Sequence, residues 1–206
     1  ALERLNLAAF LRDSEALGRA VDPPWGAGER LRCLAIVVED EVCNEQPRGW
    51  TILERIYREA ERLARHDELE WVLHSTALSA HRCARAVSDG DAPQEPNAAL
   101  KRRLVSVAYS AAERLVARFP RSGAAHERLG IVTYFDPRPD PERALACFEE
   151  ALRLGHTEQW ALWYRTCCLF DLARWDACLA SFDSISPAWF TGPQRTWRYE
   201  CYLEER

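Results

Sequence analysis

A helical pattern occurs twice in this chain of 206 residues, at a separation of 34 positions. The first copy is ALACFEEAL, at residues 144–152, and the second is CLASFDSIS, 34 positions further on. The shift places Phe148 on Phe182, and in the neighbouring helices it places Trp163 on Trp197. An accidental match of amphipathic helices would align apolar positions in general, but it would not align Phe with Phe and Trp with Trp at one period. We therefore interpret the segments as one helix–turn–helix unit used twice.

Helical patterns cover most of the chain, and strand signals are nearly absent. The one β-branched run, LAIVVEDEV, has its apolar residues at helical spacing. Clusters of Pro, Gly and Asp separate the patterns. We predict helices over residues 2–19, 27–44, 49–65, 68–88, 96–118, 123–135, 141–154, 158–172, 175–186 and 193–204. The stretch DGDAPQEP predicts a boundary between an N-terminal helical region, residues 1–96, and a C-terminal region, residues 97–206.

The C-terminal region resembles the tetratricopeptide repeat family. The first unit has a Leu-Gly pair at Leu129-Gly130, followed by an aromatic residue, Tyr134, one place later than in the family. Its second helix has the small–aromatic–small pattern of the family, at Ala144, Phe148 and Ala151. The second unit keeps the Phe but has no Leu-Gly pair, and the last unit is cut to one helix. The N-terminal region has no usable repeat signature and is open to interpretation as degenerate hairpins.

The resemblance implies an all-α fold, a superhelix of antiparallel helical hairpins (a TPR-like α-solenoid). Such hairpins stack because one hairpin alone cannot bury its apolar faces. In the family, the first helix of each hairpin lines a concave groove that holds a peptide or a protein. The corresponding positions in this chain are Glu127, Ile131, Tyr134, Trp160, Trp163, Cys167 and Phe170. The Lys, Arg and Asn residues with which some members clamp a C-terminal carboxylate are missing, which argues against a receptor for such tails.

Two interpretations remain open for the aromatic residues of the segment 158–172. They can form a binding surface with aromatic hot spots, or they can form the core between adjacent hairpins, because this helix is apolar nearly all round. Residues 98–128 are locally basic, beginning with Lys101, Arg102 and Arg103. This segment can contact phosphates or an acidic partner, or it can form salt bridges with neighbouring Glu-rich helices.

Composition excludes several classes of protein. The net charge of −5 argues against a dedicated nucleic-acid binder, and no apolar run is long enough to span a membrane. The first residues carry charges throughout and lack a signal-peptide layout, which predicts a cytoplasmic protein. The chain is rich in Arg and Ala and has a single Lys, as in proteins from GC-rich, bacterial genomes.

The eight cysteines have no C-x-x-C spacing, and we expect most of them to be buried, reduced thiols. His74, His81 and Cys83 are spaced too widely along a helix for one metal ion, and no phosphate loop or catalytic triad pattern is visible. We therefore expect a non-catalytic scaffold or adaptor that binds a protein or peptide and needs no cofactor. The alternatives are a regulatory module that contacts nucleic acid through the basic helix, and a helical enzyme.

Overall fold

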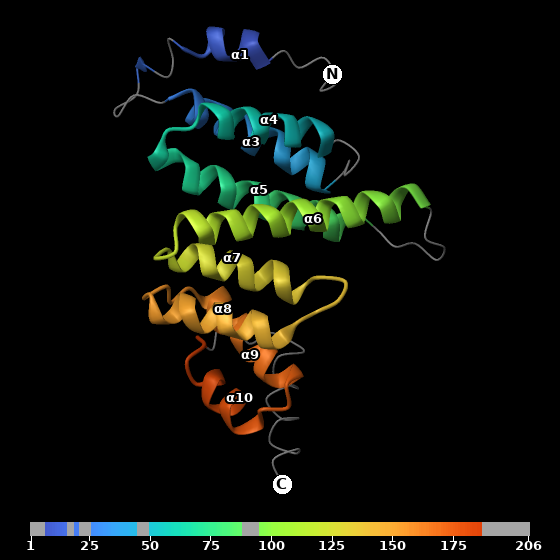
Figure 1. Cartoon of the computed structure of the whole chain (residues 1–206), viewed down its shortest axis with the longest axis vertical. Coiled ribbons are helices and arrows are strands. Elements are labelled where there is room, and N and C mark those ends of the chain that lie inside the picture. Colours follow the sequence, from blue (N-terminus) through green and yellow to red (C-terminus); the bar gives the residue numbers. More distant parts are fainter. Residues whose placement is uncertain (1–6, 16–18, 21–25, 45–49, 88–94, 187–206) are drawn as a thin grey trace. The chain divides into compact units, whose positions relative to one another are not determined.

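All of the regular secondary structure in the described residues is helical. The computed structural model describes residues 7–15, 19–20, 26–44, 50–87 and 95–186, and these contain no strand. The helices are α1 (Leu7–Asp13), α3 (Ala27–Asn44), α4 (Trp50–Leu63), α5 (His66–Ala86), α6 (Glu95–Arg118), α7 (Gly123–Tyr134), α8 (Pro141–Arg153), α9 (Gln159–Asp171) and α10 (Trp175–Phe182) (Figure 1). This confirms the all-α class.

Most helix boundaries lie close to those that the sequence predicts. The segments expected at 27–44, 96–118 and 141–154 begin and end within one residue of α3, α6 and α8. Of the helix expected at 2–19, α1 covers Leu7–Asp13, while residues 2–6 and 16–18 lie outside the described residues. The helix expected at 193–204 lies outside the described residues. No helix in the described part of the chain is both long and apolar enough to cross a membrane.

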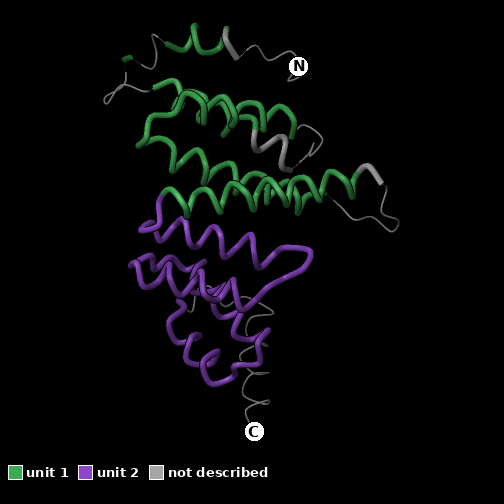
Figure 2. Tube along the Cα trace, in the orientation of Figure 1, with its two compact units in different colours: residues 1–118 green, residues 119–206 purple. Residues whose placement is uncertain are grey.

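The chain forms two compact units, residues 1–118 (unit 1) and residues 119–206 (unit 2) (Figure 2). The sequence placed the boundary between residues 96 and 97, at the Pro- and Asp-rich stretch. In the structure that stretch connects α5 to α6, and these two long helices lie side by side within unit 1 (Figure 1). The predicted boundary therefore falls inside unit 1, and the division between the units follows the end of α6.

The core of unit 1 is made largely of aliphatic side chains. Helix α4 contributes one apolar stripe, in which Trp50, Leu53, Ile56 and Ala60 are all fully buried. Their spacing of three and four residues places them on one face of the helix. That face contacts α3 and α5, so the polar residues of α4 are left on the opposite side.

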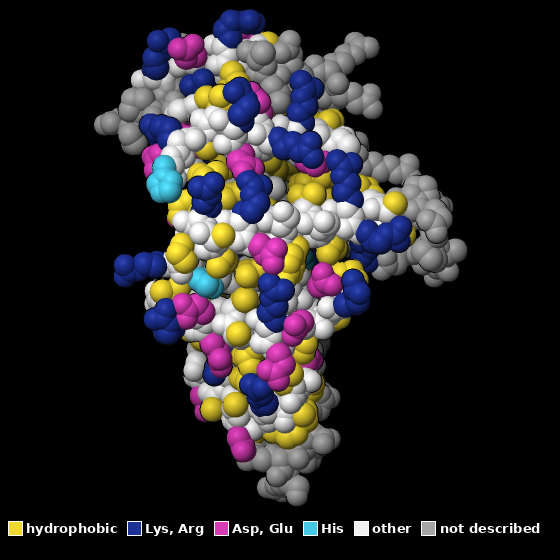
Figure 3. All heavy atoms as spheres, in the orientation of Figure 1, with side chains coloured by type: hydrophobic (Ala, Val, Ile, Leu, Met, Phe, Trp, Pro, Cys, Tyr) yellow, Lys and Arg dark blue, Asp and Glu magenta, His cyan; other side chains and the backbone are white. Residues whose placement is uncertain are grey.

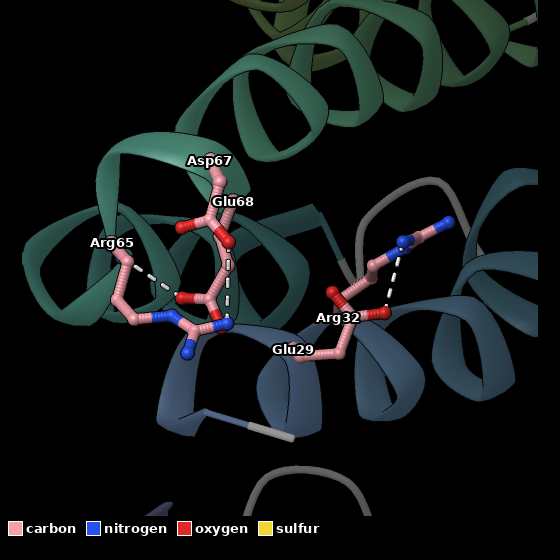
Figure 4. A network of polar contacts seen from close by, with 5 residues as sticks. All are labelled: Glu29, Arg32, Arg65, Asp67 and Glu68. Carbon is pink, nitrogen blue, oxygen red and sulfur yellow. Dashed lines mark hydrogen bonds and ion pairs between the residues drawn. The ribbon is translucent and has the colours of Figure 1, made fainter. Parts of the chain in front are cut away.

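A buried carboxylate supports the beginning of two helices in unit 1 (Figure 4). The backbone N–H of Arg65 donates a hydrogen bond of 2.9 Å to Oε2 of Glu68, which caps α5. A Cβ atom at Gly28 would lie only 2.7 Å from the same oxygen. Glycine therefore allows the first turn of α3 to approach this carboxylate, where negative charge is favourable. On the same helix Arg32 forms an ion pair of 2.9 Å with Glu29.

Unit 2 has clear capping signals, and they explain why its helix boundaries were predictable. The Ser122 hydroxyl accepts a hydrogen bond from the N–H of Ala125 at the start of α7. The carboxylate of Asp140 accepts one of 3.0 Å from the N–H of Arg143 at the start of α8, where Pro141 occupies the first position. Both caps satisfy backbone donors that have no partner within the helix.

The ends of α8 and α9 have the same turn. After α8, Gly155 has φ +83°, and the N–H of His156 donates to the carbonyl of Ala151. After α9, Ala173 takes the left-handed conformation, with φ +53°, and Arg174 makes the corresponding bond to Leu169. Glycine adopts this conformation without strain, whereas alanine does not.

Each helix of unit 2 packs against the next helix along the chain. Helix α7 packs against α8, α9 packs against α10, and α8 also contacts α9. Phe148 of α8 and Phe182 of α10, the residues aligned by the 34-residue shift, are both fully buried. The close approach of α7 to α8 depends on Gly130, where a Cβ atom would lie 2.8 Å from the Phe148 ring.

Candidate aromatic binding site

The candidate site is a group of aromatic side chains on unit 2, named here the aromatic patch: Tyr134, Phe135, Trp160 and Tyr164. Tyr134 ends α7 and Phe135 follows it, while Trp160 and Tyr164 lie one turn apart on α9. Residues separated by four positions lie on one face of a helix, so both α9 rings project on the same side. The C-terminal end of α7 supplies the other two rings.

Tyr164 is the centre of this group. Its ring is stacked on Trp160 at a centroid distance of 5.8 Å and on Phe148 at 6.0 Å, both with an interplanar angle of 19°. Tyr134 lies 5.9 Å from Tyr164, and Phe135 contacts Tyr164 edge to face at 5.4 Å. The rings therefore form a continuous stack from the buried Phe148 outwards, and such contacts restrict the orientation of each ring.

The outer end of the stack is accessible. The side chain of Trp160 is 51% exposed, whereas Tyr134, Phe135 and Tyr164 are half-buried. Large apolar side chains are rarely this exposed among the described residues, where only Ile36 and Val37 share the property. An exposed indole fixed by a ring beneath it is a suitable anchor for a partner.

Burial affects the polar groups on and near the patch, Tyr134 and Glu127. Burial raises the pKa of the Tyr134 phenol well above its ordinary value, and the nearby Cys167 and Asp171 raise it further. Tyr134 is therefore a neutral hydroxyl that can donate a hydrogen bond. Glu127, seven residues before Tyr134 on α7, is buried and pairs with His156 at 3.0 Å.

The structure brings only part of the predicted groove together. Tyr134 and Trp160 both belong to the patch, joined through Tyr164. Ile131, Trp163 and Cys167 instead belong to the core of unit 2, where they are almost fully buried. These three side chains stabilise the unit and have no surface to offer a partner.

The two remaining predicted residues have local partners. Phe170 packs edge to face on Trp175, with ring centroids 5.4 Å apart, and Glu127 is paired as described above. Tyr164 and Phe135 are not among the groove positions that the resemblance implies, although Tyr164 belongs to the aromatic residues of the segment 158–172. A sequence signal for Tyr164 does exist. It lies four residues after Trp160, and this spacing places the two rings on one helical face.

The basic segment, residues 98–128, continues from α6 into α7, and two of its arginines are paired with residues of α4. Arg103 forms an ion pair with Glu54, and Arg114 forms one with Glu61, both across to α4. The expected salt bridges to a Glu-rich neighbour are therefore present, while Arg102 remains exposed.

The six described cysteines are free thiols, and four of them are buried: Cys83, Cys167, Cys168 and Cys178. This confirms the prediction of reduced, mostly buried thiols for these residues. Among the described residues no group of three or more His, Cys, Asp or Glu side chains is placed to hold a metal ion. Comparisons with protein-family models, curated proteins and solved structures find no match for this chain.

Proposed function

We propose that this protein is a non-catalytic scaffold or adaptor that binds a protein or peptide segment through the aromatic patch. In this proposal, α7 with α8 and α9 with α10 are hairpins of the tetratricopeptide type. The pairing of consecutive helices and the matched burial of Phe148 and Phe182 support the repeat. The patch lies on α7 and α9, the first helix of each hairpin, as in the groove of that family.

The observation that carries the proposal is the position of Trp160. Its indole is half exposed, yet it is stacked on Tyr164, which is stacked in turn on the buried Phe148. A partner that covers this ring gains apolar burial at a small cost in side-chain entropy, because the ring is already held. Interfaces are enriched in such rigid aromatic anchors.

The test begins with peptides selected from a displayed random library by the wild-type chain. Their affinity is then measured for wild type and for Trp160→Ala, and we expect a loss of about 2 kcal/mol, or roughly 30-fold. Glu158→Ala, an exposed change two residues away, is the matched control and should bind like wild type. Equal affinity of Trp160→Ala and wild type would contradict the proposal.

Salt dependence separates this proposal from binding through the basic helix. Apolar burial is only weakly screened, so affinity for the selected peptides should change little between low and moderate salt. A nucleic-acid ligand on α6 would instead lose affinity steeply as salt is added, and Lys101→Glu with Arg102→Glu would abolish its binding. Observing that pattern, with normal binding by Trp160→Ala, would move the site to α6.

A further inference from the structure

A second candidate site lies in unit 1. A cleft of about 510 Å³ is lined by α4 together with Arg103 of α6. We name it the arginine cleft. Its charged lining residues are Arg55, Arg58, Arg62, Arg103, Glu54 and Glu59. Four guanidinium groups face two carboxylates, so the lining carries a net positive charge. Figure 3 shows that basic side chains are frequent on the face that includes α4 and α6.

Three of these arginines form a row on one helix. Arg55, Arg58 and Arg62 are separated by three and four residues, so they lie on one face of α4. With a rise of 1.5 Å per residue, the row extends over about 10 Å. All three are exposed, and Arg103 joins them from the neighbouring helix. Two helices therefore present cations to the same cleft.

A buried carboxylate holds two of the guanidinium groups in place. Glu54 is 7% exposed, and its two oxygens pair with Arg58 at 2.6 Å and with Arg103. Each guanidinium has five N–H donors, and one carboxylate oxygen uses only some of them. The two arginines thus remain 75% and 50% exposed, with donors still available to a ligand.

The other two arginines differ in how firmly they are held. Glu59 binds Arg62 through two hydrogen bonds, of 2.7 and 3.1 Å. Arg55 makes no hydrogen bond within the described residues. The cleft therefore combines three oriented guanidinium groups with one that can adjust to what binds. Preorganised cations lose less entropy on binding than disordered ones.

The lining favours carboxylates over nucleic acid. Among the described residues, the lining has no aromatic side chain on which a base could stack. Carboxylates pair with guanidinium in a well-matched planar geometry, and acidic side chains spaced along a peptide match the arginine row. A volume of about 510 Å³ also suits a short segment.

We propose that the arginine cleft binds a short acidic segment of a protein partner, with its carboxylates on Arg55, Arg58, Arg62 and Arg103. This site is distinct from the aromatic patch and lies in the other compact unit. The chain would then have two binding sites of opposite character, one selecting negative charge and the other apolar surface.

The test uses a fluorescein-labelled octaglutamate peptide and measures its affinity for the full chain by fluorescence anisotropy at low salt. Arg55→Glu with Arg62→Glu should weaken binding at least about tenfold. Arg55→Gln with Arg62→Gln, which removes charge without reversing it, should give a smaller loss. Circular dichroism checks that each variant is folded, and Trp160→Ala should bind the peptide like wild type.

The matched control is Arg82→Glu with Arg85→Glu, an equal change in net charge at two exposed positions of α5 outside the cleft. Binding by this control should stay within about twofold of wild type. Equal weakening by both charge reversals would show a general charge effect and overturn the proposal. So would a labelled oligothymidylate that binds through Arg55 and Arg62 while octaglutamate does not.

Discussion

The two units are built from the same kind of element, pairs of packed helices, but they bury different chemistry. Unit 1 fills its core with Leu, Ile and Ala, and it buries glutamates that orient arginines on its surface. Unit 2 combines aliphatic side chains in its core with aromatic rings and thiols. Its rings continue to the surface as the aromatic patch. In each unit, the groups that are buried determine which groups are oriented outside.

Helix α4 and helix α9 show the origin of this difference. In α4 one face is apolar and the other is charged, so the charged side chains are sorted to the outside. In α9 apolar residues surround most of the helix, so some must remain exposed wherever neighbouring helices do not cover them. In unit 1 the charged face of α4 therefore forms the surface. In unit 2 the aromatic patch is exposed because neighbouring helices cover α9 only in part.

The largest expected effect concerns the aromatic core. Phe148→Ala should reduce the free energy of unfolding by about 3–5 kcal/mol, because the ring is fully buried against Gly130 and Tyr164. Urea unfolding followed by circular dichroism measures the loss. The substitution should also weaken the near-ultraviolet circular dichroism of the stacked rings. A loss of unfolding free energy below about 1 kcal/mol would contradict the comparison of the two units, because it would mean that the stacked rings do not depend on Phe148.

The thiols of unit 2 should make stability sensitive to alkaline pH. Burial raises the pKa of Cys168 from its ordinary 9.0 to about 12. The unfolded thiol therefore loses its proton first, so this contribution is fully present below pH 9 and is lost as the pH rises towards 12. We expect about 1.4 kcal/mol per pH unit within that window.

The control for this effect is Cys168→Ala. The variant removes one titrating group, so its stability should fall less steeply between pH 9 and pH 10 than that of wild type. If stability falls with pH at the same slope in both proteins, Cys168 ionises normally in the folded state. The thiols would then not distinguish the core of unit 2 from that of unit 1.

Each unit also has a buried hydroxyl pair among its described residues, and the two pairs should contribute similarly to stability. Tyr57 and Ser79 are 2.7 Å apart in unit 1, and Thr166 and Ser181 are 2.6 Å apart in unit 2. Tyr57→Phe and Thr166→Val should each cost about 1–2 kcal/mol, because the usual net value of one hydrogen bond is about 1 kcal/mol and the Thr166 hydroxyl also donates to the carbonyl of Leu162. Denaturant unfolding measures both losses. If they differ by more than about 2 kcal/mol, buried hydroxyl groups contribute unequally to the stability of the two units.

The smallest effect on stability is expected at Trp160. Trp160→Ala should change the free energy of unfolding by less than about 0.5 kcal/mol, as at most surface positions, while Trp163→Ala should cost several times more because its ring is buried. Thermal unfolding of both variants measures the difference. Comparable losses would place both rings in the core and remove the basis for the aromatic patch.

The sequence predicts the elements well and the site only in part. The Asp140-Pro141 start and the Gly155 end of α8 are local signals, so the helix could be placed within one residue. Trp160 and Trp163 could not be assigned to surface or core, because α9 has no polar face that fixes its orientation. That assignment depends on which side α8 and α10 cover.

The arginine cleft shows a second limit of sequence reasoning. Glu54 and Arg103 are separated by 49 positions, and nothing local links them. The basic segment itself was visible, together with the possibility of salt bridges to a Glu-rich helix. Only the structure shows which glutamates of α4 accept ion pairs from α6, and which arginines then line a common cleft.

The contact between Gly130 and Phe148 has a consequence for how this protein can change over time. A methyl group at position 130 would lie 2.8 Å from the ring, so a larger residue there is tolerated only if position 148 becomes smaller. The two positions should therefore vary together among descendants of this sequence, with small beside large in either order. Each single step passes through an overfilled or hollow intermediate, so the present pair is expected to persist.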